Sequence, residues 1–315
     1  MKFKKPKFWD LKEPNLISYL LLPFTLPIIL NNFFLKFKST KKNHAIKTIC
    51  VGNIYLGGTG KTPTVMKIYQ ILKDLEINVS TAKKFYSSQY DESVILKKKT
   101  NFLTAKNRKE IIKLAEKNEK KVIIFDDGLQ DRGLEYDLKF VCFDSESFIG
   151  NGFLIPSGPL REKINDLDKY DCVLIKNNSG DKLNSQISLI KKFNPNIKIF
   201  ETNFEIKNLN LFNLNEKFII FSGIGNPSNF RNILQKNNFK IEDEIIFADH
   251  HNYNKKEIEN IVSYSKKIGA KIVTTEKDFV KVEQFNLKEI NYIDVNLLIK
   301  NEGEFKEFLK DKLYE

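Results

Sequence analysis

The residues best suited to chemistry form one short segment, Gly57-Gly58-Thr59-Gly60-Lys61-Thr62, between an apolar run and a helical pattern. Glycines let the backbone turn tightly, so successive N–H groups can point at phosphate oxygens, and the following helix adds a positive field. Lys61 can reach the β- and γ-phosphates of a nucleotide, and the Thr62 hydroxyl can ligate Mg²⁺. We therefore predict a nucleotide site, although Tyr55 stands where the strict phosphate-loop pattern has glycine.

A second signal is a pair of carboxylates, Asp126 and Asp127, directly after the apolar run 122–125. Parallel strands deliver their C-terminal ends to one edge of a sheet, so these acids should face the phosphate loop. Either carboxylate could bind Mg²⁺, directly or through water, as in other phosphate-loop enzymes. The sequence therefore predicts a metal site that contains Thr62, Asp126 and Asp127.

Three further segments carry functional residue types at positions where a loop alone does not need them. They are Asp91-Glu92 just ahead of a possible strand, the Gly/Pro-rich loop 151–162 with Arg161, and residues 247–253 with His250. If a hydroxyl group accepts the phosphate, it is a poor nucleophile at neutral pH, so a carboxylate or histidine that takes its proton would help. Taken singly, the first segment also fits a solvated acid pair, the second a turn, and the third a surface histidine pair.

Short apolar runs alternate with amphipathic stretches from residue 45 onward, which favours a parallel sheet with helices on both faces. Residues 201–217 lose this rhythm and are expected to form a linker or a hairpin, after which a second α/β series begins. The expected strands are 46–51, 77–81, 122–125, 138–143 and 172–175, then 218–221, 245–247 and 272–274; the expected helices are 61–75 and 108–118. We expect an N-terminal membrane-associated segment (1–43), a core (44–205) and a smaller C-terminal α/β domain (206–315).

The most apolar stretch of the chain is 16–35, which Pro23 and Pro27 interrupt. Apolar side chains can enter the acyl boundary of a bilayer while flanking lysines meet anionic headgroups. The flanking lysines are Lys2, Lys4, Lys5 and Lys7 before the stretch, and Lys36, Lys38, Lys41 and Lys42 after it. We expect a segment that lies on the membrane rather than one that spans it; a core-packing helix is the alternative.

The formal net charge of +12 permits nucleic acid, an anionic membrane or an acidic substrate as partner, and biased Lys, Asn and Ile usage also explains part of it. We expect no nucleic-acid partner, because no concentrated basic–aromatic motif is present. Cys50, Cys142 and Cys172 stand in apolar runs without CxxC spacing, and no secretory signal with a cleavage site is visible. A reducing cytosol therefore fits best.

In order along the chain, the segments GNxxxGGTGKTP, DE, DDGLQ, NGxxxPxGPLRE, FADHH and TTEKDxVK resemble the tetraacyldisaccharide 4'-kinase family. The resemblance implies a P-loop NTPase-like parallel-sheet core with a smaller second α/β domain. It implies ATP and Mg²⁺ as cofactors, and transfer of the γ-phosphate to the 4'-hydroxyl of a tetraacyldisaccharide 1-phosphate, which gives lipid IVA. It also implies a peripheral or monotopic protein on the cytoplasmic face of the inner membrane, which we expect to be a monomer.

The resemblance further implies that Asp91 and His250 act together as the base. Arg161 and Glu92 match acceptor-site or phosphate-site positions, with Glu92 a candidate metal ligand. Residues 82–86 replace an RGYG-like segment that many family members carry. The alternative function is a membrane-associated P-loop switch or partitioning ATPase, but such proteins place a lysine directly before the paired glycines, where this chain has Leu56.

Overall fold

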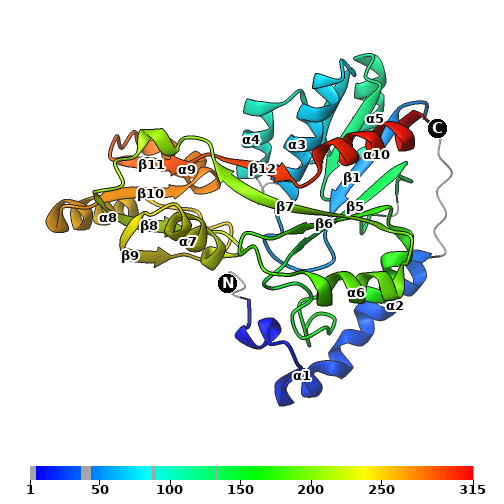
Figure 1. The fold of residues 1–315 in the computed structure, drawn as a ribbon, viewed down its shortest axis with the longest axis horizontal. Coiled ribbons are helices and arrows are strands. Elements are labelled where there is room, and N and C mark those ends of the chain that lie inside the picture. The colour runs from blue at the N-terminus through cyan, green and yellow to red at the C-terminus, as the bar shows by residue number, and fades with distance from the viewer. Residues whose placement is uncertain (1–4, 37–43, 87–89, 132, 315) are drawn as a thin grey trace. The chain divides into compact units, whose positions relative to one another are not determined.

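A computed structural model describes residues 5–36, 44–86, 90–131 and 133–314 (Figure 1). The chain divides into two compact units. The larger unit contains Lys5–Phe85, Thr100–Asn203 and Leu298–Glu315, and the smaller unit contains Tyr86–Lys99 and Phe204–Leu297. This grouping differs from the ranges expected from the sequence, because residues 86–99 join the smaller unit and the C-terminal residues join the larger one.

The larger unit is built on an eight-stranded sheet in the order β12-β7-β6-β5-β1-β4-β2-β3, with β7 and β12 continuing into the smaller unit. Its strands are β1 (Lys47–Gly52), β2 (Val79–Lys84), β3 (Phe102–Ala105), β4 (Val122–Asp126), β5 (Leu138–Asp144), β6 (Cys172–Lys176), β7 (Lys198–Ile206) and β12 (Val295–Ile299). Neighbouring strands from β3 to β7 pair in parallel. The central strands are buried along almost their whole length, as expected for a sheet covered on both faces.

Helices connect these strands and cover the sheet. They are α3 (Lys61–Asp74), α5 (Arg108–Lys117), α6 (Asn184–Phe193) and the C-terminal α10 (Glu302–Tyr314), with the short 3₁₀ helix η4 (Ile164–Lys169). Ile111, Ile112 and Ala115 of α5 pack against Phe125 and other residues of the sheet. This core fixes the C-terminal ends of β1, β2 and β4 next to one another.

The smaller unit has its own four-stranded sheet in the order β11-β10-β8-β9, and its strand pairs are parallel. Its elements are α4 (Tyr90–Lys99), η5 (Leu209–Leu211), β8 (Lys217–Ser222), α7 (Pro227–Lys236), β9 (Lys240–Ile246), α8 (Lys255–Ile268), β10 (Lys271–Thr275), α9 (Glu276–Val282), η6 (Glu283–Phe285) and β11 (Ile290–Ile293). Separate apolar clusters lie around β8 and β10. Helix α4 packs against α9, which brings residues from distant parts of the sequence together.

Two local predictions were wrong. The residues after Asp91-Glu92 form helix α4 rather than a strand, because acidic residues in its first turn and lysines in its last turn match the helix dipole. The stretch 201–217 is not a linker or hairpin throughout, because β7 extends to Ile206 before η5. The apolar run in α4 is only three residues long (94–96), and so short a run has no period that distinguishes a strand from a buried helix.

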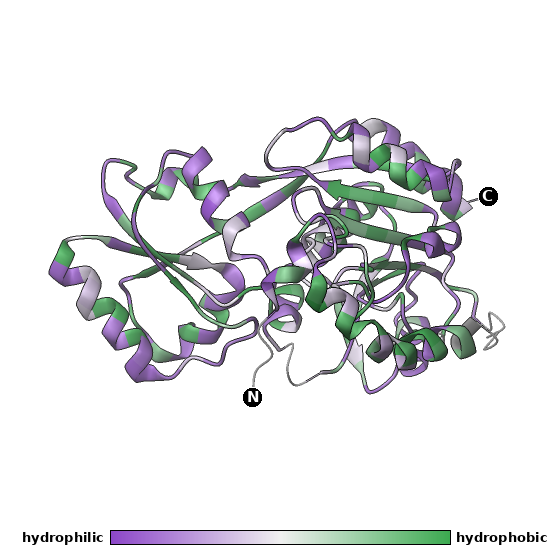
Figure 2. Cartoon of the chain, turned by 90° about the horizontal axis from the view of Figure 1, so that it is seen from below, coloured by the Kyte–Doolittle hydropathy of each residue, from purple (hydrophilic) through white to green (hydrophobic). Residues whose placement is uncertain are grey.

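The N-terminal segment of the larger unit contains η1 (Lys7–Asp10), α1 (Leu16–Leu21), η2 (Leu22–Thr25) and α2 (Leu26–Lys36). Its helical run Leu16–Phe34 is long and apolar enough to cross a membrane, as the hydropathy colours of Figure 2 indicate. Only 11% of this run is buried within the protein. Leu16, Leu20 and Phe24 are each at least 66% exposed. Of the flanking lysines, Lys2, Lys4, Lys38, Lys41 and Lys42 lie outside the described residues.

Candidate active site

The phosphate loop connects β1 to α3 in the larger unit, as its sequence predicts. Gly60 precedes the first residue of α3, Lys61, and has a φ of 85°, a left-handed conformation that glycine adopts without steric cost. The Asn53 amide at the start of the loop donates to the Gly57 carbonyl (3.1 Å) and to the Thr59 hydroxyl (3.0 Å). These bonds close the loop on itself ahead of the helix N-terminus.

Asp126 ends strand β4 between the ends of β1 and β2. The strand register pairs Val51 of β1 with Asp126, and Ala82 of β2 with Phe125, so Lys83 of β2 comes alongside the carboxylate. The Asp126 Oδ2 atom accepts from the Thr62 hydroxyl at 2.9 Å and from Lys83 Nζ at 3.2 Å. Asp126 is fully buried and Lys83 nearly so, hence this ion pair lies inside the protein.

Besides Lys83, the site contains two further cations, and both lie near Asp127. Its carboxylate lies 3.8 Å from Lys61 Nζ and 3.4 Å from the guanidinium of Arg161. Arg161 also donates to the side-chain carbonyl of Gln130 at 3.3 Å, and its backbone N–H donates to the Ile54 carbonyl at 2.7 Å. The loop 151–162 is therefore joined to the phosphate loop as well as to the carboxylate edge.

This donor set fits a nucleotide with its divalent ion. The larger unit gathers a glycine-lined helix N-terminus, two cations that reach the same carboxylate, and one hydroxyl paired with a buried carboxylate. Among the described residues, no group of three or more His, Cys, Asp or Glu side chains could hold a metal ion unaided. At phosphate loops, Mg²⁺ is usually bound in part by phosphate oxygens.

A second charged cluster lies in the smaller unit, at the start of α4. Asp91 is buried, and its Oδ2 atom lies 3.3 Å from His250 Nδ1 and 3.1 Å from Lys281 Nζ. Lys281 extends from α9, whereas His250 follows β9 and has a φ of 54°. Histidine is one of the residues that adopt this left-handed conformation more readily, and the His250 N–H donates to the Gly223 carbonyl at 3.0 Å.

Burial of Asp91 by itself would raise the pKa of its carboxyl group. The adjacent His250 imidazole and the charges of Lys277 and Lys281 outweigh burial and hold that pKa well below its usual value. Asp91 is therefore ionised across the neutral range. A carboxylate against one imidazole nitrogen leaves the other nitrogen to take or give a proton, so the pair can act as a base.

A second layer supports this pair from the segment TTEKDxVK. Asp278 is fully buried; it accepts from the Tyr253 hydroxyl (2.9 Å), the Gly223 N–H (3.0 Å) and the Thr275 hydroxyl (2.7 Å). Its other contact is Lys281 Nζ at 3.5 Å, which links it to Asp91. The chain of contacts thus fixes the cation that faces the candidate base.

The predicted site residues fall into two sets. Those of the phosphate loop lie with Asp126, Asp127 and Arg161 in the larger unit, and Asp91 lies with His250 in the smaller one. Glu92, a predicted metal ligand, is also in the smaller unit, where it forms an ion pair with Lys277 at 2.8 Å.

The sequence analysis missed Lys83 and Lys281 and gave Lys277 and Asp278 no role. A lysine at the end of an otherwise buried strand was the available signal for Lys83. A lysine one helical turn beyond Asp278 was the available signal for Lys281.

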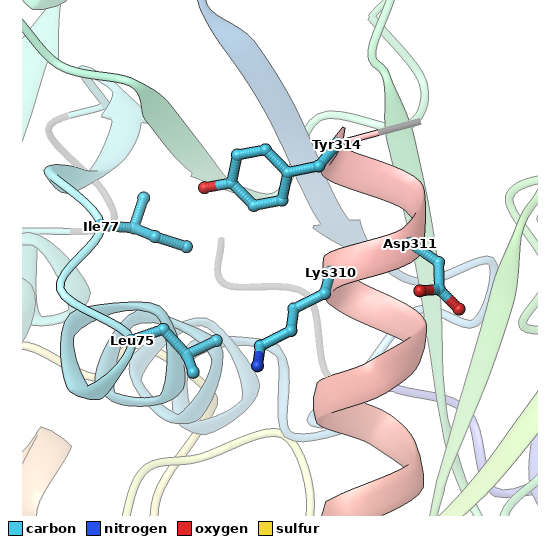
Figure 3. A pocket seen from close by; sticks show the side chains of 5 residues that line it. All are labelled: Leu75, Ile77, Lys310, Asp311 and Tyr314. Atoms are coloured by element: carbon cyan, nitrogen blue, oxygen red, sulfur yellow. The ribbon is translucent and has the colours of Figure 1, made fainter.

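A pocket of about 520 Å³ lies elsewhere in the larger unit (Figure 3). Figure 3 shows Lys310 and Tyr314 of α10 pointing toward Leu75 and Ile77, while Asp311 turns to the other side of the helix. None of the predicted site residues lines this pocket. It is separate from both charged clusters.

Comparisons with known proteins agree with the resemblance seen in the motifs. The sequence profile of the family LpxK, tetraacyldisaccharide-1-P 4'-kinase, matches residues 18–90 and 81–314. A protein of Pelagibacter ubique (strain HTCC1062), named tetraacyldisaccharide 4'-kinase, is 44% identical over 306 residues, 96% of either chain. A protein of the same name from Rickettsia felis is 33% identical over 331 residues, covering 100% of this chain and 98% of that one.

The fold is also similar to a solved structure. The crystal structure of LpxK from Aquifex aeolicus, described as a complex with ATP, has a TM-score of 0.68 and 21% sequence identity. The similarity covers 95% of this chain and 100% of that chain, so it supports the predicted P-loop NTPase-like fold. The matches do not favour a switch or partitioning ATPase. This chain belongs to the tetraacyldisaccharide 4'-kinase family.

Proposed function

We propose that this protein is a kinase that transfers the γ-phosphate of ATP to the 4'-hydroxyl of a tetraacyldisaccharide 1-phosphate, forming lipid IVA in lipid A synthesis. The observation that carries this proposal is family membership across almost the whole chain, together with a phosphate loop that leads into α3 with its lysine and threonine in place. The chemistry divides between the two units: the larger one binds the nucleotide phosphates and the smaller one accepts a proton.

In the larger unit, the N–H groups of Gly57–Gly60 and the Lys61 ammonium would bind the phosphates, and Thr62 with Asp126 would hold the ion. When bound, ATP supplies the phosphoryl group and Mg²⁺ neutralises charge on its terminal phosphates. The Thr62 hydroxyl already lies 2.9 Å from Asp126, so the two ligands are positioned beforehand. Arg161, held by Asp127 and Gln130, adds a further positive charge at this edge.

In the smaller unit, Asp91 and His250 would take the proton from the attacking hydroxyl. The proton leaves the 4'-hydroxyl oxygen for this pair, and the oxygen then bonds to phosphorus as the bond to the β-phosphate oxygen breaks. Asp91 keeps its negative charge because Lys277 and Lys281 depress its pKa, so it is ready to stabilise a protonated His250. Glu92 and Lys277 keep the start of α4 in place through their ion pair.

The N-terminal segment would bring the enzyme to its lipid substrate. Its exposed apolar residues and 11% burial fit contact with a bilayer better than a place in the protein core. We propose that a monomer binds the cytoplasmic face of the inner membrane in this way. Binding to anionic vesicles, lost on replacing Leu20 and Phe24 by Glu, would support this part; unchanged binding would contradict it.

The activity is tested by incubating the purified protein with ATP, Mg²⁺ and tetraacyldisaccharide 1-phosphate, and measuring the lipid by mass spectrometry. We expect one added phosphate, located at the 4' position by fragmentation. Lys61→Ala should abolish the product, whereas Lys73→Ala on the exposed face of α3 should not. ATP hydrolysis without phosphorylated lipid would contradict the kinase and favour a switch ATPase.

A further inference from the structure

Tyr55 is the unusual residue of the phosphate loop, because the strict loop pattern has glycine there. Its side chain is only 2% exposed. The ring lies directly against the loop backbone, since a Cβ atom built on Gly57 would come within 2.9 Å of ring carbon Cε1. The aromatic ring therefore supports the first glycine of the phosphate-binding segment.

The hydroxyl of Tyr55 reaches out of the loop to the N-terminal segment. It hydrogen bonds to the Asp10 carboxylate, and Lys5 Nζ lies 3.0 Å from the same hydroxyl. Lys5 and Asp10 form an ion pair at 2.7 Å. Burial and the neighbouring Asp10 raise the pKa of Tyr55, so the phenol keeps its proton and donates it to the carboxylate.

Apolar contacts join the same two regions. Tyr55 packs with Leu154 and Leu160 in a small cluster, against which Ile28 and Ile29 of α2 also pack. The Asn32 amide of α2 donates to the Arg161 carbonyl at 3.0 Å. Helix α2 thus contacts both the phosphate loop and the segment that carries the third cation of the site.

The loop 151–162 is held between the N-terminal segment and the phosphate loop. Trp9 is fully buried, its indole N–H donates to the Pro156 carbonyl (2.9 Å), and its own carbonyl accepts from the Asn151 N–H (3.0 Å). On the other side, the Leu56 N–H donates to the Pro159 carbonyl at 2.8 Å. The N-terminal segment is therefore bonded to the nucleotide site both directly and through this loop.

We propose that Tyr55 is a positioning residue that makes the N-terminal segment part of the nucleotide site, so that loss of the Lys5–Asp10–Tyr55 contacts weakens ATP binding. This inference rests on the proposed function only in taking ATP as the ligand. A segment that served solely as a lipid anchor would need none of these contacts, and its loss would change vesicle binding while leaving nucleotide affinity unchanged.

The first experiment uses Tyr55→Phe in the full-length protein, which keeps the ring against Gly57 and removes only the hydroxyl. We expect Mg-ATP affinity, measured calorimetrically without lipid acceptor, to fall about five- to tenfold, within the range for losing one typical intramolecular hydrogen bond. In turnover, KM for ATP should rise while kcat and KM for the acceptor change little. Tyr314→Phe, an exposed residue of the same unit, is the matched control.

A second measurement needs neither nucleotide nor activity. Amide hydrogen exchange in residues 57–60 of the free protein should be faster in Tyr55→Phe and in Asp10→Asn than in the wild type, because the loop loses its outer attachment. Combining Tyr55→Phe with Asp10→Asn should add little to either single variant, since both remove the same contact.

The outcomes separate the two proposals. Unchanged ATP affinity and unchanged exchange in Tyr55→Phe would overturn the positioning role, whether or not the protein phosphorylates lipid. Weaker ATP binding with faster exchange would support it even if the acceptor proves to be another molecule. Additive effects in the double variant would show that Tyr55 and Asp10 act separately and would contradict the coupling.

Discussion

Asp126 and Asp91 are two buried carboxylates, each followed by a second acid and each within 3.2 Å of a lysine ammonium. The two carboxylates differ in the side chain that each contacts besides its lysine. Asp126 accepts a hydrogen bond from the Thr62 hydroxyl, whose oxygen can also bind a metal ion, whereas Asp91 contacts the His250 imidazole, a group that can take or give a proton. Similar charge arrangements thus suit different chemistry because of one neighbouring side chain.

The two carboxylates also differ in how the chain assembles them. The partners of Asp126 come from the loop after β1 and from the adjacent strand β2, where strand register fixes their position. The partners of Asp91 come from the far end of the sequence; its neighbour Glu92 pairs with Lys277, 185 positions away. The surroundings of Asp126, the candidate metal ligand, therefore depend on strand order within one sheet. Those of Asp91, the candidate base, depend on packing between segments far apart in the sequence.

The largest effect is expected from Asp91→Asn. Losing the candidate base should lower kcat by about 10³-fold, within the range for general base catalysis, while ATP affinity stays within twofold of wild type. Transfer of labelled phosphate to the disaccharide and calorimetric ATP binding measure the two quantities. Glu259→Gln, on the exposed face of α8, is the control, and near-native turnover of Asp91→Asn would remove Asp91 from the mechanism.

Asp126→Asn should also lower turnover, but its effect should depend on the Mg²⁺ concentration. We expect turnover to fall about 10²-fold, and the loss should be partly recovered at high Mg²⁺ because the substitution weakens a metal ligand. Titrating activity with Mg²⁺ checks this, with Glu116→Gln on α5 as the exposed control. If the loss of turnover did not depend on the Mg²⁺ concentration, the assignment of Asp126 as a metal ligand would be contradicted.

Lys281→Met tests the pH behaviour of the base. Removing this cation should raise the pKa of Asp91, which the lysine now helps to depress, so the acid limb of kcat/KM should move to higher pH. We expect about a tenfold loss near pH 5 and little loss at neutral pH, because His250 and Lys277 still favour the ionised carboxylate. Turnover from pH 4 to 9 measures the shift, with exposed Lys256→Met as control, and an unchanged acid limb would contradict the assignment.

The smallest effect on turnover, a few-fold, is expected from Lys83→Met. Its effect on stability should be larger, about 3 kcal/mol, because it leaves a buried carboxylate without its cation. Mg²⁺ should restore more stability to Lys83→Met than to the wild type or the exposed-site variant Lys73→Met, since the ion replaces the missing charge. Thermal unfolding with and without Mg²⁺ measures this stabilisation. Equal stabilisation of the wild type, Lys83→Met and Lys73→Met would contradict a place for Lys83 beside the metal site.

The sequence predicts the phosphate-loop half of the site better than the proton-accepting half. Strands β1 and β4 and helix α3 lie within a few residues of their expected positions, because continuous apolar runs and a glycine-rich turn are local signals. In contrast, the sequence suggests a possible strand after Asp91-Glu92, and the helix α4 found there is also stabilised by packing against α9. The spacing of Lys281 from Asp278 places both on one face of α9, but nothing in the sequence shows that Lys281 contacts Asp91 of α4.

Helix α4 lies in the sequence between β2 and β3 of the larger unit, yet it belongs to the smaller one. Cutting the chain at residue 206 would consequently yield a C-terminal fragment without Asp91 and with the α4-binding side of α9 left uncovered. The two units are therefore not interchangeable modules, and recombination between relatives at that point would pair the histidine of one protein with the aspartate of another. Among relatives, the residues at positions 91, 250 and 281 should therefore vary together more strongly than other positions that are equally far apart in the sequence.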